Sequence, residues 1–202
     1  MKPVRDAETT RTRIADTAEQ LFRSIGYQKT AVADIARELG MSPANVYRFF
    51  PSKIAICEAI CARQLSDIAE GVWGIARSEA RAEDRLRRMA HYLFERNMGA
   101  FFTARRMHDM VTAAIGEHWA VVDRYVETLH GATRHVLMDG IAAGDFAPVA
   151  DADRLALAYD DALILWKHPM VISECLGHGD EPDAITRQLD ATLDLLLRGL
   201  RA

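Results

Sequence analysis

The chain has 202 residues, enough to build a sizeable core. Half of them are hydrophobic, 27% are charged and the net charge is −4, a composition typical of a globular protein. No apolar run approaches the roughly 18–20 residues that span a bilayer, and the first residues contain no apolar segment typical of a signal peptide. Three cysteines, an odd number, do not suggest a disulfide framework. We therefore expect a soluble cytoplasmic protein with no membrane partner.

The charge is unevenly distributed along the chain. Residues 1–53 hold nine Lys and Arg against six Asp and Glu, a balance of +3, whereas the remaining residues hold 16 against 23, a balance of −7. A basic first part can be attracted and oriented by phosphate although the whole chain is acidic. The alternative is ordinary fluctuation, because +3 is a small charge, so the asymmetry decides little alone.

Every segment with a clear hydrophobic period has the helical one. The expected helices cover residues 9–26, 30–39, 43–50, 52–75, 82–97, 117–143, 151–176 and 182–199, with a break at Gly99 followed by a short helix that ends at Ala114. Pro169 crowds the carbonyl of Leu165 and removes one backbone hydrogen bond, so we expect a kink there. Neither β-alternation nor a repeat is found, which predicts an all-α fold.

Residues 30–53 read as two short helices joined by a tight turn. Thr30 is a suitable N-cap for the first, because its hydroxyl oxygen can accept from an unpaired N–H group. Gly40 ends that helix, because glycine adopts the left-handed conformation without a Cβ clash. Ser42 is the expected cap of the second helix and Pro43 its first residue, where a missing N–H costs little.

The second short helix has an apolar and a polar face. Val46, Phe49 and Phe50 are expected to face inward, which leaves Asn45, Tyr47 and Arg48 facing outward. A short helix with a polar, hydrogen-bonding outer face is what the major groove of DNA accepts. The stretch therefore predicts a helix-turn-helix that binds DNA.

Together with residues 9–26, this stretch resembles the DNA-binding domain of the tetracycline-repressor (TetR) family of transcriptional regulators. The resemblance rests on Thr30-Ala-Val-Ala-Asp-Ile-Ala, Gly40-Met-Ser, Val46-Tyr-Arg-Phe-Phe and Ser52-Lys, which stand in register. It departs at Ala44, where many members have glycine, and it covers about the first quarter of the chain. It implies a DNA-binding domain over residues 1–50 and a helical domain for effector binding and dimerisation over residues 51–202, about nine helices in all.

The resemblance also implies which residues meet DNA. Those near the groove are Ser42, Pro43, Ala44, Asn45 and Arg48. Arg48 and Asn45 are the expected base readers, because Arg can pair with guanine and Asn with adenine through two hydrogen bonds. The expected phosphate contacts, which position the domain without reading sequence, are Lys29, Thr30, Tyr47 and Lys53. The alternative is a helical hairpin whose polar face is simply solvated.

The last two expected helices carry wider apolar faces than one protomer's core needs. These faces suit a four-helix interface between two protomers, built from Leu155, Ala162, Leu189, Leu193, Leu196 and Leu200. A two-fold dimer would present two DNA-binding domains to a palindromic operator. The resemblance favours this homodimer, and the alternative is that both helices pack only on their own protomer.

Aromatic and methionine side chains are frequent after residue 70, and a ligand pocket is mostly apolar with a few polar groups. The candidate lining residues are Trp73, Phe94, Met98, Phe101, Phe102, Met107, His108, Trp119, Tyr125, Tyr159 and Trp166, with His91, Arg105, Arg106, Asp160 and His168 as further polar candidates. The alternative is a solid core, because such side chains at helical spacing usually pack against one another.

Metal binding and catalysis find little support. Cys57 and Cys61 stand four residues apart on one apolar helix face, where free cysteine is commonly a small buried hydrophobe and zinc would need further ligands. His168, Glu174, Cys175 and His178 invite the same consideration. No phosphate-binding Gly-rich loop, metalloprotease His pair or nucleophile elbow is found. We expect no metal, no cofactor and no catalytic residue.

These features together predict a homodimeric transcriptional repressor, released from a palindromic operator by an unknown small-molecule effector. The alternative is an architectural or constitutive DNA-binding protein without an effector. A basic body would have supported that alternative, whereas residues after 53 are acidic.

Overall fold

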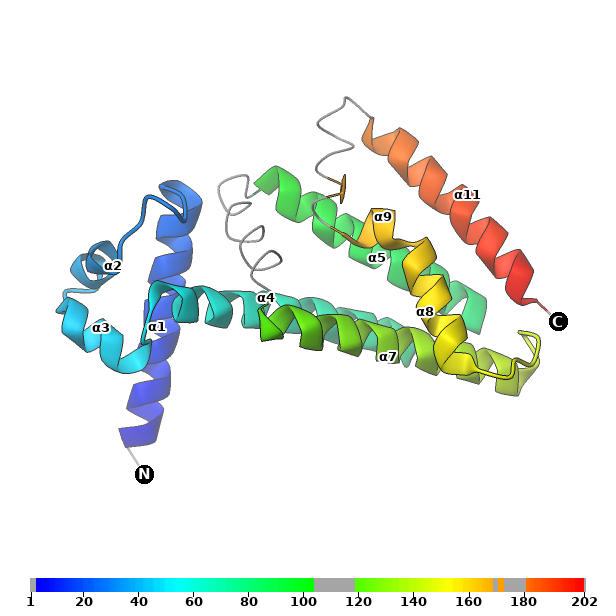
Figure 1. Ribbon diagram of the computed structural model, residues 1–202, viewed down its shortest axis with the longest axis horizontal. Coiled ribbons are helices and arrows are strands. Elements are labelled where there is room, and N and C mark those ends of the chain that lie inside the picture. Colours follow the sequence, from blue (N-terminus) through cyan, green and yellow to red (C-terminus); the bar gives the residue numbers. More distant parts are fainter. Residues whose placement is uncertain (1–2, 104–118, 169–170, 173–180, 202) are drawn as a thin grey trace. The chain divides into compact units, whose positions relative to one another are not determined.

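The structure, a computed structural model, describes residues 3–103, 119–168, 171–172 and 181–201. Its named elements are all helices (Figure 1): α1 (Pro3–Ser24), α2 (Val32–Glu38), α3 (Pro43–Phe49), α4 (Lys53–Ala76), α5 (Ala82–Thr103), α7 (Ala120–Ala143), α8 (Ala152–Ala162), α9 (Ile164–Lys167) and α11 (Pro182–Leu200). The all-α prediction is confirmed. Among the described residues, none of these helices combines the length and the apolarity that crossing a bilayer requires.

The chain divides into two compact units. One comprises Met1–Ser66 with Ala104–Asp123, and the other comprises Asp67–Thr103 with Arg124–Ala202. We call them the head and the body. The head extends further along α4 than the predicted DNA-binding domain, residues 1–50, because Ile56, Cys57 and Ile60 are buried in the head's core.

The head's core brings α1, α2, α3 and the start of α4 together. Ile14 and Phe22 of α1, Ile35 of α2 and Val46 of α3 are fully buried. The two predicted helix ends are confirmed, since Gly26 and Gly40 have φ values of 105° and 65°, the left-handed region in which glycine has no Cβ to clash.

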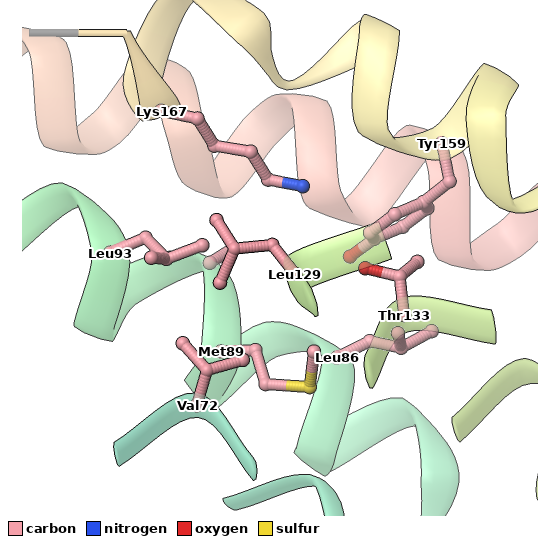
Figure 2. A pocket seen from close by; sticks show the side chains of 9 residues that line it. Val72, Leu86, Met89, Leu93, Leu129, Thr133, Tyr159 and Lys167 are labelled. Atoms are coloured by element: carbon pink, nitrogen blue, oxygen red, sulfur yellow. The ribbon is translucent and has the colours of Figure 1, made fainter. Parts of the chain in front are cut away.

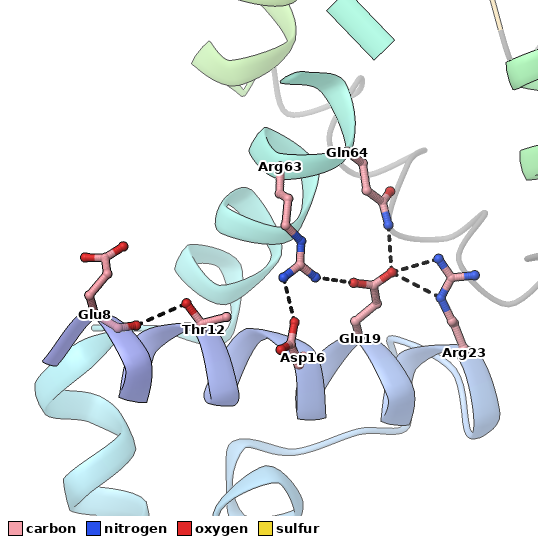
Figure 3. Close-up of polar contacts among 7 residues, drawn as sticks. All are labelled: Glu8, Thr12, Asp16, Glu19, Arg23, Arg63 and Gln64. Atoms are coloured by element: carbon pink, nitrogen blue, oxygen red, sulfur yellow. Dashed lines mark hydrogen bonds and ion pairs between the residues drawn. The ribbon is translucent and has the colours of Figure 1, made fainter. Parts of the chain in front are cut away.

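A polar cluster fastens α4 to α1 on the surface of the head (Figure 3). The two guanidinium nitrogens of Arg63 contact Asp16 at 2.6 Å and Glu19 at 2.5 Å. Gln64 donates to Glu19 at 2.9 Å, and Arg23 donates to it at 2.7 Å. Although burial acts to raise the pKa of the Glu19 carboxyl, hydrogen bonds from Arg23 and Arg63 lower it below its ordinary value.

The body's core is formed by the end of α4, by α5, α7, α8 and α9, and by one face of α11. Gly71 shows how α4 and α5 approach each other. A Cβ at that position would lie 2.1 Å from the Tyr92 hydroxyl. The glycine that weakens the helix in isolation therefore makes room for Tyr92, and α4 continues past it to Ala76.

Two helix boundaries differ from the prediction. Gly99 does not break α5, which continues to Thr103. The expected kink at Pro169, a residue outside the described ones, is preceded by a real break at Leu163, where φ and ψ are −103° and 9°. Leu163 is fully buried, and Trp166 just after the break packs inside the body. The break therefore falls at a residue that is packed in the body's core. The short helix expected near Ala114 also lies outside the described residues.

Candidate DNA-binding surface and body cavity

The first turn of α3 is held by its own cap and lies on the surface. The Ser42 hydroxyl oxygen accepts a hydrogen bond from the Asn45 N–H at 3.2 Å, and Pro43 is the first helical residue, as predicted. Exposed positions are Ser42, Pro43, Ala44, Tyr47 and Arg48, with Asn45 half-buried. The residues predicted to lie near the groove therefore share one outward surface.

Contacts below α3 fix the direction of this surface. Val46 is fully buried and Phe50 nearly so. Arg11 of α1 donates to the Phe49 carbonyl, and its guanidinium carbon lies 4.3 Å from the centre of the Phe50 ring. Such a cation over an aromatic face adds attraction beyond packing. One basic residue of the head is thus used to hold α3 against α1.

Thr30 does not have its predicted cap role. It is only 2% exposed, and its hydroxyl donates to the Gly26 carbonyl at 2.8 Å. The N-cap of α2 is Ala31, whose N–H donates to the Asp34 carboxylate at 2.9 Å. This hydrogen bond, with one from Arg37, lowers the pKa of Asp34. The Thr30 hydroxyl is thus directed at the Gly26 carbonyl, whereas Lys29, the other predicted phosphate contact in this loop, is exposed.

Lys53 has a structural role that its position in the sequence did not indicate. Its Nζ donates to the carbonyls of Tyr27 at 2.8 Å and Thr30 at 3.1 Å, and it lies 4.2 Å from the centre of the Tyr27 ring. The first residue of α4 thereby fixes the loop between α1 and α2.

We expect Lys53→Met to lower the free energy of unfolding by about 1–3 kcal/mol, because the Thr30 carbonyl loses its ammonium donor and the Tyr27 carbonyl keeps only the Thr30 N–H. Urea unfolding measures this change. Lys29→Met removes the same charge from an exposed neighbour and should alter stability by less than about 0.5 kcal/mol. Equal losses in the two variants would contradict the loop-fixing role.

Cys57 and Cys61 are both buried in the head. Burial raises the pKa of Cys57 to about 12 and that of Cys61 to about 11, so both thiols stay protonated at neutral pH. Within the described part of the chain, no three His, Cys, Asp or Glu side chains gather to hold a metal ion. Glu174, Cys175 and His178 lie outside that part.

The raised thiol pKa values predict a pH dependence of stability. Unfolded thiols lose their protons near 9.0, whereas the folded thiols keep theirs to about 11 and 12. The folded state then binds more protons, so the free energy of unfolding should fall as pH rises from about 9 to about 12. Urea unfolding of the wild type between about pH 8 and pH 10 should show a steeper fall than the Cys57→Ala/Cys61→Ala variant. Identical slopes would contradict the prediction.

The body contains a small cavity of about 10 Å³ between α4, α5, α7, α8 and α9 (Figure 2). Its apolar wall consists of Val72, Leu86, Met89, Ala90, Leu93 and Leu129. Thr133, Tyr159 and Lys167 form its polar end. The volume accommodates about one water molecule.

Of the predicted pocket residues that the structure describes, Tyr159 lines this cavity. Phe94, Met98 and Trp166 are buried in the body's core instead, and Trp73 and Tyr125 are half-buried. The prediction for Trp119 needs correction, because this side chain packs in the head's core. Nothing is described of the side chains of Phe101 and Phe102, and Met107 and His108 lie outside the described residues.

The polar end of the cavity is organised by Asp160. One oxygen of its carboxylate accepts from the Thr133 hydroxyl at 2.9 Å and from the Lys167 ammonium. The other lies 3.1 Å from His130 Nδ1. Thr133 and Lys167 were missed by sequence reasoning. The available signal was the opposite charge of Lys167, seven residues after Asp160 and thus near one helical face.

The predicted dimer residues fall into two groups. Leu189 and Leu193 are fully buried within their own protomer, which is the alternative that the sequence left open. Leu155, Leu196 and Leu200 are half-buried and Ala162 is exposed. The large exposed apolar side chains nearby are Leu157, Ile164 and Leu195, with exposures of 52%, 53% and 73%. None of these three large exposed side chains of α8, α9 and α11 is among the six residues predicted for the interface.

Two family models match parts of the chain. A family model described as "Tetracyclin repressor-like, C-terminal domain" matches residues 82–186, and one described as "Bacterial regulatory proteins, tetR family" matches residues 14–60. The comparison with curated proteins gives no match.

Solved structures show the same fold. A TetR-family transcriptional regulator from Pectobacterium atrosepticum is 22% identical, with 98% of this chain and 96% of that chain covered and a TM-score of 0.74. The regulator FadR from Bacillus subtilis, in complex with stearoyl-CoA, is 15% identical, with 94% and 99% covered and a TM-score of 0.66. A TetR/AcrR-family regulator from Thermobifida fusca is 20% identical, with 96% and 100% covered and a TM-score of 0.63. The chain therefore belongs to the tetracycline-repressor family and is a DNA-binding transcriptional regulator.

Proposed function

We propose that this protein is a homodimeric repressor that binds a palindromic operator through α3 and leaves it when a small molecule enters the body. The observation that carries the proposal is the polar outer surface of α3, where Arg48 is exposed and Asn45 is half-buried, opposite the buried Val46. These are side chains that read adenine and guanine in the major groove. Proteins of this family are generally not enzymes, which agrees with the function proposed.

The homodimer is supported by the exposed apolar side chains Leu157, Ile164 and Leu195. Their helices, α8, α9 and α11, all belong to the body, and their inward faces are occupied by the body's own core. A second copy that covers these side chains would remove apolar surface from water at roughly 25 cal/mol per Å². A two-fold axis would then place two α3 helices against two half-sites.

The proposed signal runs along α4. This single helix carries Val72, which lines the cavity, and Arg63, which contacts Asp16 and Glu19 of α1. The two positions are about 14 Å apart along the helix axis, at 1.5 Å per residue. A ligand that favours one position of Val72 would thereby shift α4 and change the contacts of Arg63 with Asp16 and Glu19. A coupling of about 1–3 kcal/mol between ligand and DNA would change operator affinity about 5- to 150-fold.

The effector role is supported by the Bacillus subtilis regulator of the same fold, which was solved with stearoyl-CoA. A second candidate function, a constitutive DNA-binding protein without an effector, is favoured by the small volume of the cavity, about 10 Å³. The two candidates share the DNA-binding surface and differ only in whether occupation of the body changes operator affinity.

Selection of bound sequences from a pool of random DNA duplexes tests the proposal. We expect an inverted repeat whose half-sites lie about one helical turn, or a multiple of it, apart. Light scattering of the free protein should give the mass of a dimer. A pool without any enriched sequence, or a monomer that binds a single half-site, would contradict the proposal.

A further inference from the structure

We infer that the body cavity binds a small, electrically neutral molecule that has an apolar body and one hydrogen-bonding oxygen, such as an alcohol, a phenol or a ketone. Tyr159 is the anchor for that oxygen. The inference rests on the proposed function, because it names the chemical class of the effector. It is nonetheless testable by binding alone, without DNA.

The wall of the cavity selects for an apolar body. Val72, Leu86, Met89 and Leu93 point toward one another from α4 and α5, and Leu129 of α7 closes the wall (Figure 2). The first four are no more than 3% exposed. Such a lining contributes binding free energy by removing apolar ligand surface from water.

The hydroxyl of Tyr159 indicates where the oxygen would bind. Tyr159 is 5% exposed and lines the cavity. Its Oη has no hydrogen-bond partner among the residues that the structure describes. A buried hydroxyl without a partner is costly, and such groups are normally paired in proteins. Burial raises the pKa of Tyr159, so this phenol stays neutral and can both donate and accept.

The charges at the polar end argue for a neutral ligand. The Lys167 ammonium and the Thr133 hydroxyl already donate to Asp160, and His130 lies against its other oxygen. An anion would have to take Lys167 from Asp160, which would leave a largely buried carboxylate without its cation. A cationic ligand would be repelled by the Lys167 ammonium, which lines the cavity. A neutral oxygen disturbs neither charge and supplies the partner that Tyr159 lacks.

The size of the cavity sets a limit on the ligand. About 10 Å³ holds one water molecule, which is the competing occupant. A larger molecule must displace side chains. Met89 is suited to this, because its unbranched side chain adapts to new shapes. A molecule larger than water therefore enters only if such side chains move, so we expect the ligand to be small.

Titration calorimetry and thermal unfolding of the full chain with four one-ring probes test the inference. We expect benzyl alcohol to bind and to raise the melting temperature. Toluene should bind about three- to tenfold more weakly, the ratio that one neutral hydrogen bond provides. Benzoate and benzylammonium should bind more weakly still, because each is charged.

Two variants locate the site. Tyr159→Phe should reduce the affinity for benzyl alcohol to that for toluene and leave the affinity for toluene unchanged. It should also leave the stability of the free protein unchanged or raised, because an unpaired hydroxyl is removed. Tyr125→Phe, at a half-buried tyrosine of the body that does not line the cavity, should change neither affinity.

Three results would overturn the inference. These are no binding of any probe, which means that the cavity holds only water; equal affinities for toluene and benzyl alcohol in the wild type; and stronger binding of benzoate. None of these results would contradict the proposal that α3 binds operator DNA. Conversely, bound benzyl alcohol that leaves operator affinity unchanged would refute the proposed release from DNA while the site itself stands.

Discussion

The Arg48→Ala variant is expected to lose most of its preference for the operator over unrelated DNA. Arg48 is exposed on α3, and its guanidinium can pair with guanine through two hydrogen bonds. Such a pair contributes about 1–3 kcal/mol of discrimination per half-site. In a dimer both half-sites lose the contact. Competition gel shifts with operator and scrambled duplexes measure the preference directly.

Two further variants separate base reading from charge. Arg48→Lys keeps the charge but lacks the planar pair of donors, so its preference should fall while its affinity for scrambled DNA stays near that of the wild type. Arg37→Ala removes an arginine of α2 whose side chain is 76% exposed and contacts Asp34, and it should keep the preference. An Arg48→Ala protein that selects the wild-type operator would show that another residue reads the bases.

Aspartate at two nearby positions of α11 should have different effects, since one substitution should unfold the protomer and the other should only dissociate the proposed dimer. Leu193 is fully buried in its own protomer, so Leu193→Asp places an unpaired carboxylate in the body's core and should unfold it. Leu195 is 73% exposed, so Leu195→Asp should leave the protomer folded and dissociate the proposed dimer. Its carboxylates would otherwise be desolvated at an apolar interface.

Circular dichroism and light scattering at micromolar concentration distinguish the two outcomes. Leu193→Asp should lose helical signal, whereas Leu195→Asp should keep it and halve the measured mass. Val126→Asp serves as a control, because Val126 of α7 is similarly exposed, at 57%, and lies outside the proposed interface. A Leu195→Asp protein with the mass of the wild type would place the interface elsewhere.

The elements that the sequence predicted best are those with local causes. Gly26 and Gly40 end helices through their own backbone conformation. Ser42 and Pro43 begin α3 through contacts within the same turn. These signals act over three or four residues, so the head and its outward α3 surface could be predicted before any tertiary structure was known.

The features that the sequence did not predict depend on partners far away in the sequence. Lys53 is held by the carbonyls of Tyr27 and Thr30, which periodicity does not reveal. Trp119 packs in the head although most of the chain after α4 belongs to the body. An apolar stripe in the sequence predicts that one face of a helix is buried, but it does not indicate which element covers that face. The fully buried Leu193 and the exposed Leu195 of α11 show this difference within one helix.

Occupation of the body is expected to weaken operator binding, and a titration of the operator with and without ligand measures this effect. The operator obtained by selection is titrated with the wild-type protein alone and with saturating benzyl alcohol, whose binding is verified in the same samples by the shift in melting temperature. We expect a dissociation constant for the operator that is about 5- to 150-fold higher with ligand. An unchanged dissociation constant with the cavity occupied would contradict it and favour a constitutive DNA-binding protein.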